Sequence, residues 1–366
     1  MKNANELVAV MRMGQANAYY HLKPVVMSGI VDHLHIVRPL PPEIPGVISG
    51  STYHEVKGKT IVTRLAKVFL KTLSLGMRRE VKGFISFYAY PYGLIACLAG
   101  MLTRKPVHIG FVGDDWYGHS FAWYGPVLNA IFRRAALITV TGPKMKDEMV
   151  ERHFPSHRIH HLPHAIDLDR YLDTPPKDRR YDCIYVGDLI PRKRVHDIIA
   201  AIHEVKKVKS DLRLLIVGDG PLRSGLESQA ESLGLDGTIT FAGFQSDPSK
   251  FFCDSKIVVI SSYREGFPFT LVEGMAAGAV PVSTPVGTIP DIVIHGETGL
   301  LFPVGDVSGL AGCILKLLTD EALFGSLRSE VLVKRSEYGF ERVAGLWAEW
   351  IGRNFYHWTG REGMDY

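Results

Sequence analysis

The chain has 366 residues, of which 46% are hydrophobic and 22% are charged, and its formal net charge is +4. This length is enough for two domains with separate cores, and the composition is that of a soluble globular protein. Apolar runs stay well below the roughly 20 residues that a membrane-spanning helix needs, and the first residues lack the apolar core of a secretory signal. The four cysteines are far apart, so we expect a cytoplasmic protein without disulfides or a cysteine metal site.

Apolar runs in the first half of the chain alternate with segments that can be helical. The runs with strand character cover 7–13, 34–39, 83–90, 107–113 and 136–141. Short apolar strands that alternate with helices predict a parallel sheet covered on both faces. No period of 20–50 residues recurs, which excludes a solenoid.

One predicted helix of the first half, Ile61 to Leu75, has two distinct faces. The basic residues Arg64, Lys67 and Lys71 share one of them. The other is apolar and holds Val62, Leu65, Ala66, Phe69, Leu70 and Leu73. Such a helix either lies on an anionic membrane or packs as an ordinary surface helix on the core.

The second half of the chain is more regular. Predicted strands cover 182–187, 212–218, 238–243, 256–261 and 279–284, each separated from the next by a helical segment. Residues 172–180 hold two prolines among charged residues, which is incompatible with a helix interior or a central strand, so we interpret them as a linker. Two doubly wound domains bind ligands at the carboxyl ends of their strands. The last helical stretch, 340–355, is rich in aromatic residues.

The segment Ser261 to Gly278, SSYREGFPFTLVEGMAAG, is the most informative stretch of the sequence. It follows an apolar strand, and we expect a helix to open near Pro268. Glu265 then lies in the loop and Glu273 lies about one turn inside the helix. The loop amides at a helix N-terminus suit an anionic phosphate, and the helical carboxylate can accept from ribose hydroxyls. The alternative is that both glutamates are ordinary surface carboxylates at a strand-to-helix turn.

The frame EGFPFTLVE resembles the nucleotide-sugar site of the retaining GT-B glycosyltransferases of family 4, also called glycosyl transferases group 1. The resemblance implies an α/β protein of GT-B type, with two Rossmann-like doubly wound parallel-sheet domains facing a cleft. It makes 1–171 the N-terminal acceptor-binding domain and 172–180 the linker. Residues 181–337 become the nucleotide-sugar-binding domain, and 338–366 a helical tail that crosses back to the first domain.

The same resemblance implies roles for individual residues. Glu265 and Lys193 would be catalytic, and Glu273 would hold the donor ribose. Further donor-binding residues would be Arg192, Arg194, Gly266, Phe267, Pro268, Phe269, Gly218, Phe244 and Gly14. The segment 284–303, which contains Gly287, also fits the family.

The segment VGDLIPRKR departs from the family at one position. It resembles a GRLxxxKG segment whose Arg and Lys contact the donor diphosphate, and Lys193 matches the Lys. Asp188 stands where the Arg is usual, and a carboxylate cannot neutralise a diphosphate. Either Arg192 or Arg194 supplies the missing charge, or Asp188 points elsewhere.

A second departure lies in GFVGDDWYGHS, which ends a first-half strand. Family members often carry a His-Asp pair there, and the His approaches the transferred sugar. Here Gly113 and Asp114 occupy that place, so Asp114 is our third catalytic candidate. Asp115 or His119 can supply the polar group instead, and His119 can equally be a packing residue.

The resemblance also implies the reaction and its partners. The enzyme would be a metal-independent, retaining glycosyltransferase without a cofactor, so we reject the DxD-like sequence 167–169 as a metal site. The donor would be a UDP- or GDP-linked sugar and the acceptor a glycan or a lipid-linked hydroxyl, in cell-surface polysaccharide or glycoconjugate synthesis. An anionic membrane surface at the inner face of the cell membrane is a further expected partner, and nucleic acid is not. The alternatives are a non-catalytic nucleotide-sugar-binding protein and a nucleotide-sugar epimerase.

Overall fold

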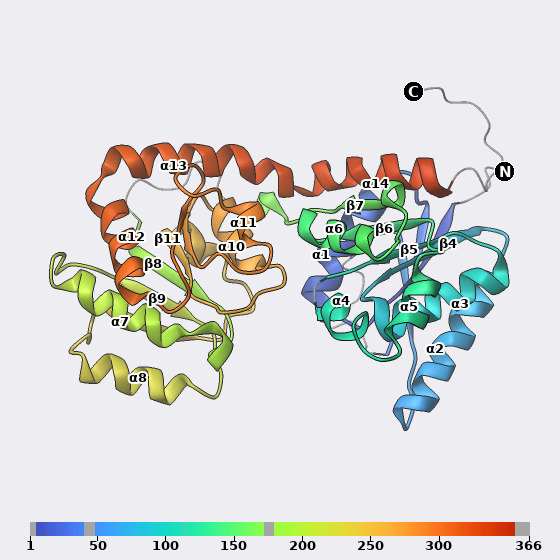
Figure 1. The fold of residues 1–366 in the computed structure, drawn as a ribbon, viewed down its shortest axis with the longest axis horizontal. Helices are drawn as coiled ribbons and strands as arrows, with labels where there is room; N and C mark the ends of the chain where they lie inside the picture. The colour runs from blue at the N-terminus through green and yellow to red at the C-terminus, as the bar shows by residue number, and fades with distance from the viewer. Residues whose placement is uncertain (1–4, 40–47, 113, 172–178, 356–366) are drawn as a thin grey trace. The chain divides into compact units, whose positions relative to one another are not determined.

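Two parallel β-sheets organise the chain, one in each of two units (Figure 1). The structure is a computed structural model that describes residues 5–39, 48–112, 114–171 and 179–355. The first unit is Met1–Ala165 together with Phe340–Tyr366, and the second is Ile166–Gly339. The predicted α/β fold class is confirmed, because every pairing between the strands of these described ranges is parallel.

The sheet of the first unit has seven strands within the described residues, in the order β3-β2-β1-β4-β5-β6-β7. Its strands are β1 (Glu6–Val10), β2 (His33–Arg38), β3 (Ser51–Glu55), β4 (Val81–Phe87), β5 (Val107–Gly110), β6 (Leu137–Val140) and β7 (Ile159–His161). The order reverses between β1 and β4, so connections leave these two neighbours in opposite directions. The apolar runs that predicted strands coincide with β1, β2, β4, β5 and β6.

Helices cover both faces of this sheet. They are α1 (Gln15–Met27), α2 (Ile61–Gly76), α3 (Leu94–Thr103), α4 (Asp114–His119), α5 (Gly125–Phe132), α6 (Pro143–Glu151) and α14 (Phe340–Phe355). Successive side chains of β4 point to opposite faces of the sheet, so neighbouring residues of this strand contact different layers of helices. A Cβ on Gly83 would lie 2.8 Å from the ring of Phe355 in α14. Phe84 instead faces α2 and α3, where a Cβ on Gly76 would meet its ring at 2.5 Å.

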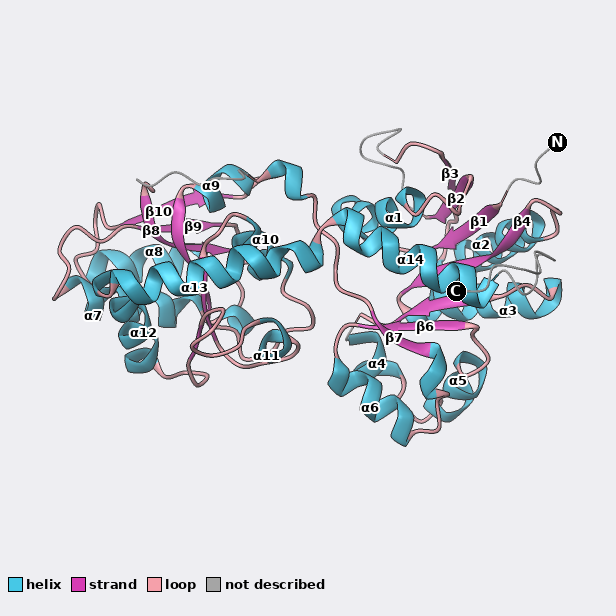
Figure 2. Cartoon of the chain, turned by 90° about the horizontal axis from the view of Figure 1, so that it is seen from above, coloured by secondary structure: helices cyan, strands magenta, loops and turns pink. Residues whose placement is uncertain are grey.

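The C-terminal helix α14 packs against α1 in the first unit, as Figure 2 shows. Trp347 is completely buried and lies against Phe87 and His108, with ring centroids 6.1 and 4.8 Å away. This confirms that the C-terminal helical tail returns to the first domain. The aromatic residues of the tail are therefore core residues of a unit that begins more than 300 residues earlier in the chain.

The structure corrects the predicted faces of α2. Val68, Thr72 and Leu75 are buried, and Leu65 and Phe69 of the predicted apolar face pack against the core, whereas Val62 and Leu70 of that face are 72% and 61% exposed. The hydroxyl of Thr72 donates to the carbonyl of Val68 at 2.7 Å, so its polar atom is satisfied within the helix and can be buried. The predicted apolar face is therefore only partly buried, and Thr72 belongs to the buried side.

The sheet of the second unit has six strands over the part of the chain that the structure describes, in the order β10-β9-β8-β11-β12-β13. Its strands are β8 (Tyr181–Val186), β9 (Leu214–Val217), β10 (Ile239–Gly243), β11 (Ser255–Ile260), β12 (Val280–Ser283) and β13 (Leu300–Leu301). Its helices are α7 (Val195–Lys206), α8 (Arg223–Ser232), α9 (Ser249–Cys253), α10 (Phe269–Ala276), α11 (Ile289–Ile292), α12 (Val307–Thr319) and α13 (Glu321–Lys334). All five strands predicted in the second half are present.

The two units divide earlier than the predicted boundary at 171. Ile166 donates its N–H to the carbonyl of Tyr338 at 2.7 Å, and Ile166 and Tyr171 are buried in the core of the second unit. Residues 166–171 therefore belong to the second unit. Of the predicted linker, 172–178 lie outside the described residues. None of the described helices combines the length and the apolar character that crossing a bilayer requires.

The buried histidines of the first unit predict a pH-dependent stability. Burial lowers the pKa of His21 and of His108 to about 3. In the unfolded chain their pKa is about 6.5, so between pH 6.5 and 3 the unfolded chain binds more protons and stability falls as the pH is lowered. Each histidine lowers the free energy of unfolding by up to about 1.4 kcal/mol for each pH unit of acidification in this window.

Tryptophan fluorescence during urea unfolding at pH 7, 6 and 5 measures this effect, because all five tryptophans belong to the first unit. We expect His108→Gln, which keeps a polar group beside Thr139, to flatten the pH dependence. An unfolding midpoint that stays constant from pH 7 to 5 would contradict the prediction.

Candidate functional site

The sheet of the second unit reverses its strand order between β8 and β11. The loops that follow these two neighbouring strands leave the same edge of the sheet in opposite directions, and ligands of open α/β sheets bind at such a point. The first loop, 187–194, carries Lys193 and Arg192, and the second, 261–268, carries Glu265. The candidate site is therefore built on the switch point of this sheet.

Glu265 lies at the centre of this site, and its side chain is only 5% exposed. Its Oε1 accepts from the ammonium of Lys193 at 2.6 Å and from the hydroxyl of Ser262 at 2.5 Å. Its Oε2 accepts from a guanidinium N–H of Arg192 at 3.0 Å. The carboxylate is thus buried but balanced by two cations from the neighbouring loop. The predicted catalytic pair, Glu265 and Lys193, is in direct contact.

Main-chain contacts fix these two loops to each other. The hydroxyl of Ser261 donates to the carbonyls of Lys193 and Arg194 at 2.8 and 3.0 Å. The N–H of Tyr263 donates to the carbonyl of Arg192 at 3.2 Å, and Arg192 donates back to the carbonyl of Arg264 at 2.7 Å. The ion pairs with Glu265 are therefore held in a preformed frame.

A third loop, which follows β12, contacts the main chain of the loop 261–268 that carries Glu265. Gly287 has φ of +60°, and a Cβ placed on it would lie 2.1 Å from the carbonyl oxygen of Glu265. The hydroxyl of Thr288 donates to the carbonyl of Gly266 at 2.9 Å. Only glycine permits both this backbone conformation and this approach. Gly287, which fitted the family without an assigned role, sets the position of Glu265.

The second glutamate lies on α10, which begins at Phe269 with Pro268 as its N-cap, as predicted. Glu273 is 8% exposed, and its Oε1 accepts from the hydroxyl of Tyr171 at 3.3 Å. Both glutamates are therefore buried, which excludes the interpretation that they are ordinary surface carboxylates. Tyr171 was not predicted here, because it lies 102 residues earlier in the chain.

The glycine and aromatic candidates Gly218 and Phe244 lie at the same edge of the sheet. Gly218 follows β9, and a Cβ on it would lie 1.9 Å from the carbonyl oxygen of Gly187, so the loops after β8 and β9 are in contact. Its N–H donates to the carbonyl of Gly243 at 2.8 Å. Phe244 follows β10 directly and is 75% exposed. Its ring can therefore contact a ligand.

The structure distinguishes between the two arginines proposed to replace the missing diphosphate contact. Arg194 binds the carboxylate of Asp197 through two hydrogen bonds of 2.6 and 3.1 Å, so its charge is balanced at the start of α7. Arg192 lies beside Lys193 on Glu265. Asp188 is exposed, and its main-chain carbonyl accepts from the hydroxyl of Tyr185 at 2.9 Å. Burial, together with the carboxylates of Glu265 and Asp188, raises the pKa of Tyr185.

The first-unit candidates lie on a different sheet. Asp114 is the first residue of α4, and its side chain lies outside the described residues. Asp115 is buried, and its carboxylate accepts from the main-chain N–H groups of Ala89, Val112 and Trp116 at 2.9 to 3.0 Å. Burial raises the pKa of Asp115, against the effect of these hydrogen bonds. We infer that Asp115 fixes the main chain between β5 and α4 through these hydrogen bonds.

Two further candidate residues of the first unit have clear surroundings. His119 is partly buried, with Nδ1 2.7 Å from the hydroxyl of Tyr124 and its ring 4.8 Å from that of Tyr90. It is thus a packing residue, which was one of the two predicted roles. Gly14 is exposed and is the N-cap residue of α1.

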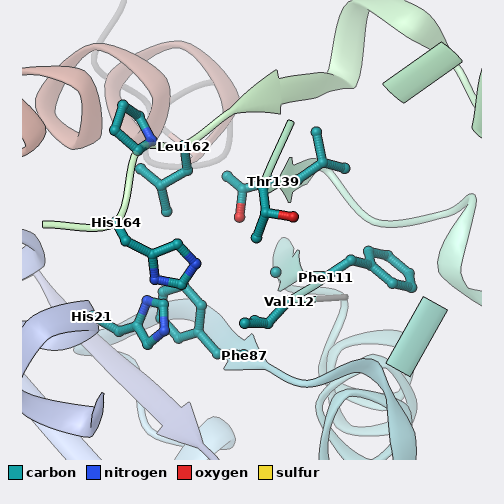
Figure 3. Close-up of a pocket in the computed structure, with 11 residues that line it drawn as sticks. His21, Phe87, Phe111, Val112, Thr139, Leu162 and His164 are labelled. Atoms are coloured by element: carbon teal, nitrogen blue, oxygen red, sulfur yellow. The ribbon is translucent and has the colours of Figure 1, made fainter. Parts of the chain in front are cut away.

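The first unit contains a small cavity of about 10 Å³ at the carboxyl ends of β5, β6 and β7. Figure 3 shows His21 and His164 side by side at one wall, where the two ring centroids are 4.7 Å apart. Burial lowers the pKa of both imidazoles, so they are neutral at physiological pH. None of the site residues predicted from the sequence lines this cavity.

No group of three or more His, Cys, Asp and Glu side chains within the described residues is arranged to hold a metal ion. This includes the segment 167–169, the last two residues of which begin a short turn, Leu168–Arg170.

Comparison with known proteins identifies the fold of the second unit. Residues 173–338 match the family described as "Glycosyl transferases group 1". The second unit belongs to this family. Solved structures similar to the whole chain include Anabaena Alr3699/HepE in complex with UDP and glucose, with a TM-score of 0.79, 17% identity, and coverage of 96% of this chain and 100% of that one. The likeness establishes that the chain has the GT-B fold.

Among curated relatives, an N-acetyl-alpha-D-glucosaminyl L-malate synthase of Bacillus anthracis is 28% identical, over 64% of this chain and 65% of its own length. The capsular polysaccharide biosynthesis glycosyltransferase CapM of Staphylococcus aureus is 29% identical, over 63% and 66%. A 2-deoxystreptamine N-acetyl-D-glucosaminyltransferase of Niallia circulans is 31% identical, over 46% and 44%. The chain thus spans less than two thirds of these relatives.

The close approach at Gly287 predicts a specific sensitivity of the glutamate loop. Gly287→Ala should displace residues 261–268, because its Cβ would overlap the carbonyl of Glu265 and strain a left-handed backbone, at a cost on the order of 1–3 kcal/mol. Gly225→Ala in α8, where a Cβ meets nothing within 4 Å, should be neutral or stabilising by up to about 1 kcal/mol.

Hydrogen exchange of the 261–268 peptide and urea unfolding followed by circular dichroism measure the two effects. Equal exchange of this peptide in Gly287→Ala and in the unsubstituted protein would show that Gly287 does not position the loop.

Proposed function

We propose that this protein is a retaining, metal-independent glycosyltransferase of cell-surface polysaccharide or glycoconjugate synthesis. It moves a sugar from a nucleotide-diphosphate sugar to a hydroxyl group of a glycan or a lipid-linked acceptor. The observation that supports this best is the buried cluster of Glu265, Lys193 and Arg192 at the switch point of the second sheet. Glu273 adds a second buried carboxylate from the helix that begins at the end of the same loop.

The second unit binds the donor in this proposal. Lys193, Arg192 and the N-terminal end of α10 face the diphosphate, since a helix N-terminus and two cations favour an anion. Glu273 accepts hydrogen bonds from the ribose, and the exposed ring of Phe244 contacts the base. Glu265 holds a hydroxyl of the donor sugar while it keeps Lys193 in position. UDP-linked sugars are the first donors to test, because the similar HepE structures are described with UDP.

The transfer step needs no protein nucleophile. The bond between the anomeric carbon and the diphosphate oxygen breaks, and the acceptor oxygen bonds to that carbon on the same face of the sugar. The acceptor proton passes to the departing diphosphate. Lys193 and Arg192 stabilise the charge that develops on the leaving group, and their preformed positions avoid reorganisation during the step. Asp114, at the start of α4, remains the candidate polar group beside the transferred sugar.

The first unit binds the acceptor in this proposal. The support is that the cluster of Glu265, Lys193 and Arg192, which serves the donor, lies entirely in the second unit. We also propose that the protein is cytoplasmic and that α2 rests on an anionic membrane. Val62, Leu70 and Met77 are 72%, 61% and 75% exposed on this helix and its end, close in sequence to Lys67, Arg78 and Arg79.

The test of the function is a panel of UDP- and GDP-sugars, with slow donor hydrolysis measured by release of the nucleoside diphosphate. We expect hydrolysis of at least one donor, unchanged by EDTA. Donor binding without hydrolysis or transfer would identify a non-catalytic binding protein, and a donor recovered with an altered sugar would identify an epimerase. Activity lost in EDTA and restored by manganese would contradict metal independence.

Removal of the Lys193 ammonium group should strongly reduce turnover. Lys193→Ala should reduce turnover by roughly 100-fold or more, the scale seen when one preorganised charge-stabilising group is removed. Lys207→Ala is the matched control, because Lys207 is exposed and pairs only with Glu204 among the described residues. Steady-state rates with the active donor measure both variants. Equal turnover of Lys193→Ala and Lys207→Ala would exclude the proposed role.

Substitution of Glu273 should weaken the binding of the donor nucleotide. Glu273→Gln keeps the shape of the buried side chain but weakens its acceptor, so we expect UDP binding to lose on the order of 1–3 kcal/mol. Tyr171→Phe removes the hydroxyl that bonds to Glu273 and leaves the carboxylate in place, so it should have a smaller effect. Isothermal titration with UDP compares them. Unchanged affinity in a folded Glu273→Gln protein would remove Glu273 from the donor site.

A further inference from the structure

Four aromatic rings gather at the carboxyl ends of β4 and β5, which are neighbours in the first sheet. They belong to Tyr90, in the short π-helix Ala89–Gly93 after β4, and to His119, Trp123 and Tyr124, in and after α4. The ring centroid of Tyr90 lies 4.8 Å from that of His119 and 6.1 Å from that of Tyr124. Trp123 meets Tyr124 edge-on, with 5.5 Å between centroids. This aromatic cluster therefore lies at the edge of the sheet where ligands of α/β proteins bind.

Two rings of the aromatic cluster face solvent, and the other two support them. Trp123 is 92% exposed and Tyr90 is 39% exposed. His119 and Tyr124 are partly buried and are joined by a contact of 2.7 Å between the imidazole Nδ1 and the phenol hydroxyl. An exposed ring adds little to the core, and two of them on one supporting ring form a contiguous patch of the kind that marks a binding surface.

The main chain that carries these rings is fixed. A Cβ on Gly125 would lie 2.3 Å from the carbonyl oxygen of Ser120, and the same carbonyl accepts from the side-chain amide of Asn129 at 3.3 Å. On the β4 side, the carboxylate of Asp115 accepts from the N–H of Ala89 at 2.9 Å. The exposed rings are thus held in place before a ligand arrives, which reduces the entropy cost of binding.

The surface around the aromatic cluster is uncharged. The sequence contains no Asp, Glu, Lys or Arg in 83–103 or in 116–132, the two segments that carry the rings. Among the described residues, no cation lies over one of the four rings, whereas Phe121 of the same loop has the guanidinium of Arg152 3.8 Å from its ring centroid. Phosphates and anionic lipid headgroups are recognised by basic residues, so the cluster favours a neutral ligand.

The polar atoms of the two exposed rings favour a sugar as that neutral ligand. Tyr90 carries a hydroxyl and Trp123 an indole N–H at the edge of an apolar ring. A lipid chain would cover these groups without giving them a hydrogen-bond partner, which is unfavourable. A sugar ring has an apolar face of C–H groups and a rim of hydroxyls, so it can stack on an aromatic ring and still pair with the polar edge.

We propose that Tyr90 and Trp123 form a platform on which a sugar residue of the acceptor stacks. The acceptor is then a neutral glycan, or the neutral glycan part of a lipid-linked molecule, and this assignment rests on the proposed glycosyltransferase function. His119 and Tyr124 are positioning residues that hold the two rings. Helix α4 begins at Asp114, the proposed polar group beside the transferred sugar, and ends at His119, roughly 8 Å further along its axis. A stacked acceptor residue therefore lies close to the proposed point of transfer.

The first experiment measures sugar binding by the full chain without any donor. The probes are maltose, cellobiose, lactose and diacetylchitobiose, observed by saturation-transfer difference NMR, which detects the sugar protons that lie against the protein. We expect at least one disaccharide to give a saturable signal, strongest for the C–H protons of one face, with a Kd on the order of 1 mM. Trp123→Ala and Tyr90→Leu should each weaken this binding by about tenfold or more.

Two further variants make this result interpretable. Phe121→Ala removes a ring that is 51% exposed in the same loop but lies outside the aromatic cluster, so it should leave sugar binding unchanged. Trp123→Phe keeps an aromatic ring and should retain most of the binding. No saturable signal from any of the four disaccharides, or equal weakening by Phe121→Ala and Trp123→Ala, would overturn the proposal. Binding to phosphatidylcholine vesicles that Trp123→Ala loses, with sugar binding unchanged, would assign the surface to a membrane and overturn it as well.

The second experiment separates the platform from the proposed function. A disaccharide that binds is offered as acceptor together with the active donor. Trp123→Ala should raise the KM for this disaccharide by about tenfold or more, while donor hydrolysis without acceptor stays within about twofold of the unsubstituted protein. Absence of transfer to every disaccharide that binds, or an equal loss of transfer and donor hydrolysis in Trp123→Ala, would overturn the acceptor assignment. Sugar binding that depends on Trp123, in a protein that hydrolyses no nucleotide sugar, would leave the platform standing and refute the proposed function instead.

Discussion

The burial of Glu265 is the constraint on which the donor site depends. A carboxylate that is 5% exposed must be balanced, and Lys193 and Arg192 provide the two cations from a loop more than 70 residues earlier in the chain. The contact links the ends of β8 and β11, which are adjacent in the sheet only because the strand order reverses there. An ion pair of this kind fixes the cations in place before any ligand arrives, which is the condition for electrostatic stabilisation of a leaving group.

Close approaches at glycine make this arrangement possible. The loops at the carboxyl edge of the second sheet touch where Gly218 meets Gly187 and where Gly287 meets Glu265, at distances that exclude any side chain. Hydroxyl groups then join the loops: Ser261 bonds to the main chain of the lysine loop, and Thr288 to that of the glutamate loop. The site is rigid because its main chain, not only its charged side chains, is connected.

The first unit balances its buried polar groups in a different way. His21 and His164 are buried as neutral imidazoles, since burial lowers the pKa of each, and they pack beside Phe87 without any need for a counter-ion. The two sheets therefore present different chemistry at their carboxyl edges, with neutral hydrogen-bonding groups around the cavity of the first and the ion-paired cluster of Glu265, Lys193 and Arg192 at the second.

The sequence by itself determined the two parallel sheets, the helix that begins at Phe269 and the pairing of a loop glutamate with a helical one, because apolar periodicity and turn residues act locally. It did not determine the partners of those glutamates. Tyr171 and the cations at 192–193 reach them only through strand order, which is a property of the folded sheet. The burial of Thr72 depended on its hydrogen bond to the carbonyl of Val68 within α2. Local pattern fixes elements, whereas burial and charge balance are decided by contacts between residues far apart in the chain.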